Sequence, residues 1–72
     1  MRLEDFRIDV ARLSRPELST LSNVSVSTIK RAEEGKKIDR LSQSRILDGL
    51  SRQVGRTVTR EDIDEFGDGA SD

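Results

Sequence analysis

The sequence contains neither cysteine nor histidine, and these two absences exclude several classes of function at once. They rule out disulfides, Cys/His zinc sites and the usual nucleophile–base pairs of enzymes. No calcium-loop spacing such as D-x-D-x-D-G occurs, so a metal site built from carboxylates is not expected either. No apolar run approaches the roughly 20 residues of a membrane span, and no signal peptide is recognisable. We therefore expect a cytoplasmic protein that is not an enzyme, has no cofactor and does not contact a membrane.

The composition allows one domain with a small core, because only 32% of the 72 residues are hydrophobic and 38% are charged. The net charge of −1 conceals an asymmetry along the chain. Residues 1–60 carry 13 Lys and Arg against 8 Asp and Glu, a net charge of +5, whereas residues 61–72 carry six acids and no base. This pattern indicates a moderately basic body followed by an acidic tail, which either only solubilises the chain or binds a partner.

Apolar spacing predicts a first helix over residues 3–11. Leu3, Phe6 and Val10 lie three and four residues apart and form one face, which we expect to be buried. Ile8 falls off that face, and the sequence does not indicate what packs against it.

The stretch 13–23 carries the signals of a second helix. Ser14 and Glu17 have the spacing of a capping box, and Leu13 and Leu18 flank it as a hydrophobic staple. The helix is predicted to run to about residue 22, where Asn23 suits a left-handed turn.

A third helix is predicted over residues 26–34, with the same kind of N-cap and hydrophobic staple at its start. Ser25 is its predicted N-cap, Val24 and Ile29 its staple, and Gly35 its stop. A helical wheel places Ile29 and Ala32 inward. The outward side and its edges carry Val26, Ser27, Thr28, Lys30, Arg31 and Glu34.

Two more helices are expected in the rest of the chain. A fourth, roughly over residues 41–53, is weakened by Gly49, which costs about 1 kcal/mol against Ala. Thr59 and Asp62 predict a third cap, with Val58 and Ile63 as staple, before a short last helix to about Phe66. Residues 67–72 are predicted to be a disordered acidic tail. The apolar set of the fourth helix is Leu41, Ile46, Leu47, Leu50 and Val54.

The pair of helices over residues 13–35 is the strongest functional signal. A tight turn between two short helices, an open N-terminal end of the second helix and long donors on its outward face suit the major groove of DNA. The residues predicted to contact bases are Val26, Ser27, Lys30 and Arg31, because cations can donate to guanine O6 and N7. The residues predicted to contact phosphates are Arg15, Thr28, Lys36, Lys37 and Arg40.

Two plainer interpretations compete with this one. The helices can form a simple hairpin whose Lys and Arg are only a solvated face. Glu33 and Glu34 are adjacent acids, but side chains of neighbouring residues diverge by about 100° on a helix, which disfavours acid–base chemistry. Glu33 is expected instead to brace the third helix against the first or second.

Residues 13–37 resemble the Cro/lambda-repressor-like helix-turn-helix family, also called the XRE family. The matching motifs are Leu-Ser at 13–14, Glu-Leu-Ser at 17–19, Asn-Val-Ser at 23–25, Thr-Ile at 28–29 and Glu-Glu-Gly-Lys at 33–36. Arg15 replaces the family's common Gln, and Asn23 its usual Gly. Family members often have an Arg in the first helix that pairs with the Glu matching Glu33; counting back without a gap reaches Ile8, with Arg7 one residue off. Either the register slips by one or that pair is absent.

The resemblance implies an all-α, compact bundle of four or five helices over residues 1–66. It implies binding of double-stranded operator DNA, usually by a dimer on a pseudo-palindromic site, with the base contacts named above. Together these observations predict a small bacterial or phage-type transcription regulator. Alternatives are an antitoxin that also binds a toxin, for example through residues 61–72, and a module that docks on RNA polymerase or another protein without binding DNA. Candidates for the homodimer interface, unless they complete the monomer core, are Leu50, Val54, Val58 and Phe66.

Overall fold

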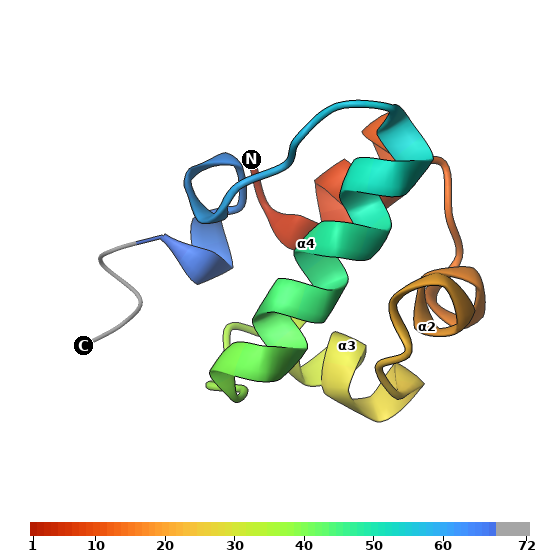
Figure 1. Cartoon of the computed structure of the whole chain (residues 1–72). Coiled ribbons are helices and arrows are strands. Elements are labelled where there is room, and N and C mark those ends of the chain that lie inside the picture. The colour runs from red at the N-terminus through yellow and green to blue at the C-terminus, as the bar shows by residue number, and fades with distance from the viewer. Residues whose placement is uncertain (68–72) are drawn as a thin grey trace.

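The computed structural model describes residues 1–67; the predicted tail beyond Gly67 lies outside the described residues. Within that part the secondary structure is entirely helical, which confirms the predicted all-α class. The long helix α4 runs through the middle of the molecule, with α2 and α3 on one side of it and η2 and η3 on the other (Figure 1). In chain order the elements are α1 (Leu3–Asp5), η1 (Phe6–Val10), α2 (Arg15–Ser22), α3 (Val26–Glu33), α4 (Arg40–Val54), η2 (Arg60–Asp62) and η3 (Asp64–Phe66).

The predicted caps of α2 are present. The amide of Glu17 donates to Ser14 Oγ over 3.2 Å, and the amide of Ser14 donates to Glu17 Oε1 over 2.8 Å, which completes the capping box. Asn23 ends the helix in the left-handed conformation at φ +59°. These local contacts fix both ends of α2 and so set the direction in which the chain enters α3.

The ends of α3 also match their predictions. Ser25 Oγ accepts from the amide of Thr28 over 3.2 Å at the start of the helix. Gly35 has φ +80° just beyond its end, a conformation that side-chain-bearing residues rarely adopt.

The first segment departs from the predicted helix. After one α-helical turn, residues 6–10 form a π-helical turn in which the amide of Ala11 donates to the carbonyl of Phe6 over 2.9 Å, five residues back. The extra residue moves Ala11 into the buried place that Val10 would take in an α-helix. The prediction that Val10 is buried is therefore wrong: its side chain is 39% exposed, and Ile8 beside it is also exposed.

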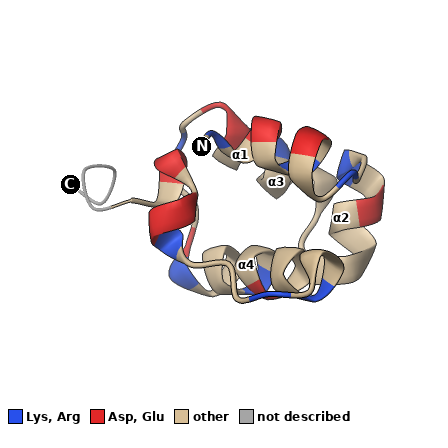
Figure 2. Cartoon of the chain, turned by 90° about the horizontal axis from the view of Figure 1, so that it is seen from above, with Lys and Arg blue, Asp and Glu red and all other residues tan. Residues whose placement is uncertain are grey.

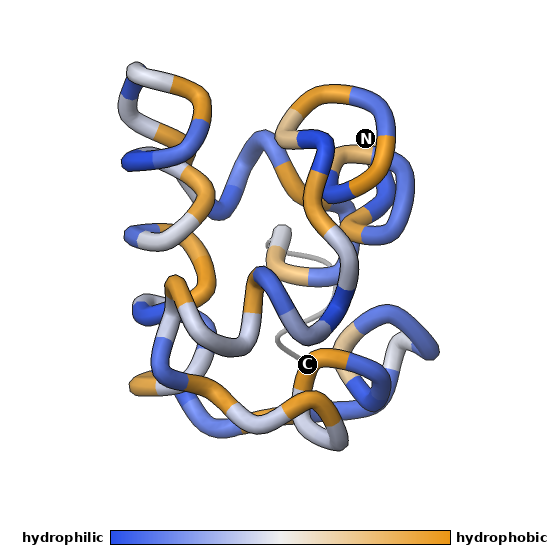
Figure 3. Tube along the Cα trace, turned by 90° about the vertical axis from the view of Figure 1, so that its right-hand side faces the viewer, coloured by the Kyte–Doolittle hydropathy of each residue, from blue (hydrophilic) through white to orange (hydrophobic). Residues whose placement is uncertain are grey.

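One apolar core receives side chains from every element except η2. Figure 3 shows hydrophobic and hydrophilic stretches alternating along the helices, as expected for amphipathic helices around a common core. The predicted inward position of Leu41 is wrong, since this residue in the first turn of α4 is 57% exposed. The largest fully buried side chains are Leu3, Leu18, Ile29, Ile46, Leu50 and Ile63.

Gly49 has a packing role that its helix propensity does not suggest. It lies where α4 crosses α2, and a Cβ added there would stand 3.1 Å from Ser22 Cβ and 3.2 Å from Ser22 Cα. The missing side chain thus lets the two helices approach closely, which compensates for the weakening of α4 expected from glycine.

The last predicted helix is replaced by two 3₁₀ turns, η2 and η3. The Thr59–Asp62 capping box is present, and Val58 and Ile63 are buried as the staple requires. Ile63 adopts an extended conformation (φ −118°, ψ 118°), however, so the two turns do not merge into one α-helix. Each turn is only three residues long, a length typical of 3₁₀ structure.

Part of the acidic segment holds the start of the chain. The amide of Leu3 donates to Glu65 Oε1 over 2.7 Å, and Asp64 Oδ1 lies 3.0 Å from the amino group of Met1. In Figure 2 the acidic residues gather along the N-terminal segment and over η2 and η3. Asp64 and Glu65 are therefore part of the fold, so the acidic segment 61–72 is not a tail over its whole length.

The capping carboxylates make the fold sensitive to acid. The amide of Ser14, followed by its hydroxyl, lowers the pKa of Glu17 below its ordinary value of 4.5, and the amide of Thr59 lowers that of Asp62 below 3.8. A lowered pKa in the folded state means that the stabilisation is complete above the ordinary value and is lost as pH falls through the folded value. We expect urea-unfolding midpoints to be flat near neutral pH and to fall below about pH 4.5.

The variant Glu17→Gln tests this origin. Its midpoint should be lower than that of the wild type at pH 7, and the gap should narrow as pH falls below 4. If the plots of urea midpoint against pH were parallel for the two proteins across the acid range, Glu17 would not be a source of the acid sensitivity.

Candidate functional site

The outward face of α3 presents the four side chains predicted to contact bases. Val26, Ser27, Lys30 and Arg31 are all exposed, whereas Ile29 on the opposite face is fully buried. The structure therefore brings the four predicted residues onto one accessible helical surface, which we call the α3 face.

The two cations of the α3 face are electrostatically available. Neither Lys30 nor Arg31 has an ion-pair or side-chain hydrogen-bond partner among residues 1–67. The neighbouring acid Glu34 instead lies 3.3 Å from the ammonium group of Lys36. Two long, unpaired donors on a firmly held helix are able to bind an acceptor-rich partner.

A buried ion triad positions α3. Glu33, in its last turn, has a side chain that is only 2% exposed and binds two guanidinium groups. Arg7 Nε of η1 donates to Glu33 Oε2, and Arg15 Nε of α2 donates to Glu33 Oε1 over 2.9 Å. The Arg7 guanidinium also donates to the carbonyl of Leu13 over 3.0 Å. Glu33 thus ties α3 to both earlier segments, which confirms its predicted bracing role.

The π turn explains why Arg7 rather than Ile8 reaches Glu33. The extra residue shifts the register of the first segment by one position, which is one of the two possibilities that the sequence allowed. As a result Arg7 is buried and Ile8 is exposed. Arg12 closes the segment in the left-handed conformation at φ +59°, and the amide of Leu13 donates to the carbonyl of Arg7 over 2.9 Å. Arg7 was not among the predicted site residues; the signal for it was the family's first-helix Arg, which lies one residue from Arg7 when the motif is counted back without a gap.

Two of the predicted phosphate-binding residues serve the fold as well. Both Nε and one terminal nitrogen of Arg15 lie 2.9 Å from Glu33 Oε1, and its side chain is 33% exposed. Thr28 is half-buried, and its hydroxyl accepts from Ser25 Oγ over 2.9 Å. Arg15 therefore lies at the start of α2 with its guanidinium already oriented by a carboxylate.

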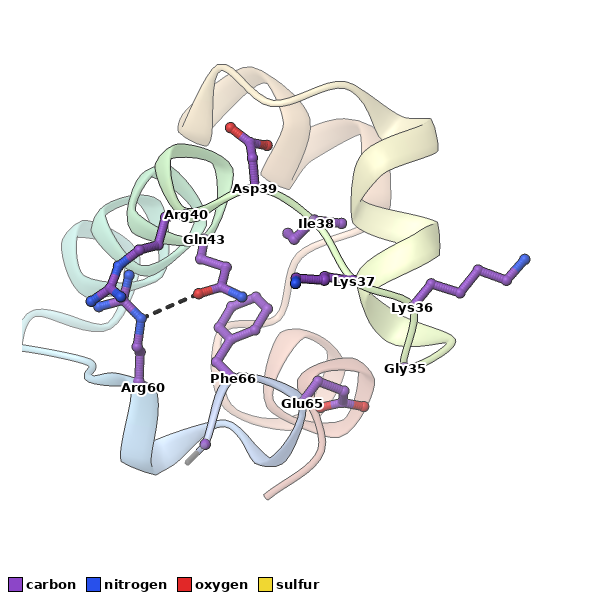
Figure 4. A pocket seen from close by; sticks show the side chains of 11 residues that line it. Gly35, Lys36, Lys37, Ile38, Asp39, Arg40, Gln43, Arg60, Glu65 and Phe66 are labelled. Atoms are coloured by element: carbon purple, nitrogen blue, oxygen red, sulfur yellow. Dashed lines mark hydrogen bonds between the residues drawn. The ribbon is translucent and has the colours of Figure 1, made fainter. Parts of the chain in front are cut away.

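The other three predicted phosphate contacts follow α3. Lys36, Lys37 and Arg40 are exposed residues of the connection to α4 and of its first position. Figure 4 shows Lys36 directed outward and Lys37 directed into a pocket that Arg40 also lines. The structure places these cations next to the C-terminal end of the α3 face.

The described residues offer no arrangement suited to metal binding. No group of three or more His, Cys, Asp or Glu that could hold a metal ion occurs in residues 1–67. The adjacent acids also separate as expected, because Glu33 is buried between two arginines and Glu34 faces solvent. Within the same residues, no helix is both long and apolar enough to cross a membrane.

Comparison with protein-family models, with curated proteins and with solved structures finds no match to this chain. The resemblance to the Cro/lambda-repressor-like family therefore stays a prediction that depends on the motifs in residues 13–37.

Proposed function

We propose that this protein is a sequence-specific double-stranded DNA-binding protein that regulates transcription and reads the major groove with α3. The observation that carries the proposal is the α3 face, where Lys30 and Arg31 are exposed and unpaired within the described residues. Arginine and lysine donors match the two acceptors of guanine in the major groove.

The way α3 is held supports the same function. A recognition helix needs a fixed orientation, because its side chains must meet base edges within hydrogen-bond distance. The Ser25 cap fixes the start of α3, and the Arg7–Glu33–Arg15 triad fixes its end. The start of α2, where Arg15 lies, is the natural place for a phosphate next to the groove.

A homodimer on a pseudo-palindromic operator is part of this proposal, since one recognition helix reads only about half a site. Leu50, Val58 and Phe66 are buried within the monomer and half-buried Val54 packs against the same core, so all four complete the core. The proposed dimer would therefore not use the buried side chains of Leu50, Val58 and Phe66.

The proposal is tested by selecting duplex DNA from a random pool and measuring fluorescence anisotropy at about 50–200 mM salt. We expect a selected site to be bound at least about 10³-fold more tightly than random duplexes, with affinity falling steeply in salt. A symmetric selected site would support the dimer. Equal binding to every duplex, or none at about 50 mM salt, would overturn the proposal.

The antitoxin alternative gains no support from the described part of the acidic segment. Asp62 caps η2, while Asp64 and Glu65 contact the N-terminal residues. The other alternative, in which α2 and α3 dock on another protein, predicts that no duplex is bound even at about 50 mM salt.

A further inference from the structure

A basic pocket opens directly beyond the C-terminal end of α3. It has a volume of about 550 Å³ and is lined by residues 35–39, the first turns of α4, and the η2–η3 region. Lys37 and Arg40, three residues apart, and Arg60, from η2, bring three positive charges to it (Figure 4). Arg60, in η2, was not among the predicted site residues.

These three cations have no carboxylate partner among residues 1–67. The Arg60 guanidinium is oriented by neutral groups alone: Nε donates to Gln43 Oε1 over 3.2 Å and a terminal nitrogen donates to Ser44 Oγ over 3.4 Å. The pocket therefore holds an oriented guanidinium close to two further positive charges, and none of the three is ion-paired within the described residues.

The two acids that line the pocket are engaged elsewhere. Glu65 accepts from the amide of Leu3 over 2.7 Å and lies 3.9 Å from the guanidinium of Arg2. Asp39 precedes α4 with its carboxylate turned away from the pocket, and the Ser42 side chain lowers its pKa (Figure 4). Neither carboxylate forms an ion pair with any of the three cations.

We infer that this pocket binds a phosphate group through Lys37, Arg40 and Arg60. Guanidinium groups match phosphate oxygens with paired, charge-assisted hydrogen bonds, and the first turn of α4 adds the positive end of a helix dipole. The source of the phosphate depends on the proposed function: the pocket adjoins the end of α3, so the group is a DNA backbone phosphate flanking the bases that α3 reads. Arg60 is then a DNA-binding residue outside the α2–α3 pair.

The test compares Arg60→Gln with Arg56→Gln on the selected duplex. Both variants remove one positive charge, but Arg56 does not line the pocket and lies 3.7 Å from Asp62. The slope of log affinity against log salt should become shallower by about 0.9 in Arg60→Gln. As salt rises over 50–200 mM, the ratio of the wild-type affinity to the Arg60→Gln affinity should fall by about 3.5-fold. The fall should be the same on selected and random duplexes. Arg56→Gln should keep the wild-type slope.

A second variant guards against a folding defect. Arg40 makes no side-chain hydrogen bond or ion pair among the described residues, so Arg40→Gln should fold normally and show the same change of slope. Steep wild-type binding combined with unchanged slopes in both variants would overturn the phosphate pocket and leave the proposed function standing.

If the wild type binds no duplex, the proposed function fails. A titration with inorganic phosphate then tests whether the pocket binds a phosphate group. Saturable NMR shifts of the amide and side-chain N–H signals of Lys37, Arg40 and Arg60, absent in Arg60→Gln, would support a site for free phosphate. An unperturbed spectrum would overturn the inference that this pocket binds phosphate, whether or not the protein binds DNA.

Discussion

Replacing Glu33 with alanine is expected to lower the free energy of unfolding by about 3–5 kcal/mol. The substitution leaves the guanidinium of Arg7, only 7% exposed, without its carboxylate, and a buried charge without a partner is strongly unfavourable. A domain of this kind is stabilised by about 5–15 kcal/mol in total, so the variant should be close to unfolding at room temperature. Urea denaturation followed by circular dichroism measures the loss.

Arg15→Ala is the matched control for this prediction. The Arg15 side chain is 33% exposed, and its removal leaves the Arg7–Glu33 pair intact, so we expect a loss of about 1 kcal/mol or less. The double variant Arg7→Met/Glu33→Leu should recover much of the stability, since an apolar pair of similar volume avoids the cost of burying charge. If Glu33→Ala lost no more than the roughly 1 kcal/mol expected of Arg15→Ala, the buried Arg7–Glu33 pair would not be a major source of stability.

The features that the sequence predicts correctly depend on contacts between near neighbours. The Ser14–Glu17 capping box and the Ser25 cap form within three residues, and the left-handed turns at Asn23 and Gly35 depend on a single residue type. Such signals survive in almost any tertiary context, which is why the bounds of α2 and α3 and the composition of the α3 face could be predicted.

The features that the sequence misses depend on distant partners. Whether Val10 or Ala11 is buried is decided by the π turn that lets Arg7 reach Glu33, 26 residues further along the chain. Arg60 likewise lies in the basic pocket because η2 packs beside the first turns of α4, where it meets Gln43. Helical periodicity alone assumes a regular α-helix and cannot predict either contact.

The double variant Lys30→Ala/Arg31→Ala is expected to lose specific DNA binding almost completely. Each cation that contacts a base contributes about 1–3 kcal/mol of discrimination, so losing both should cost about 2–6 kcal/mol if the contacts are independent. Both side chains are exposed and alanine favours helices, so the far-UV spectrum and urea midpoint should stay close to those of the wild type. Anisotropy with selected and random duplexes measures the effect.

The control for this prediction removes the same charge from a different helix. Arg45→Ala/Arg52→Ala changes two exposed cations of α4. Arg52 also donates to the carbonyl of Leu21 in α2 over 3.0 Å, so the urea midpoint of this variant is measured alongside its affinity. The variant should weaken binding to all duplexes by a similar factor, because it reduces the long-range electrostatic attraction. The α3 variant should instead approach the affinity of the wild type for random DNA, since its base contacts are gone while its phosphate contacts remain. Equal losses of specificity in the two variants would mean that α3 supplies charge rather than sequence readout, and the major-groove model would have to be abandoned.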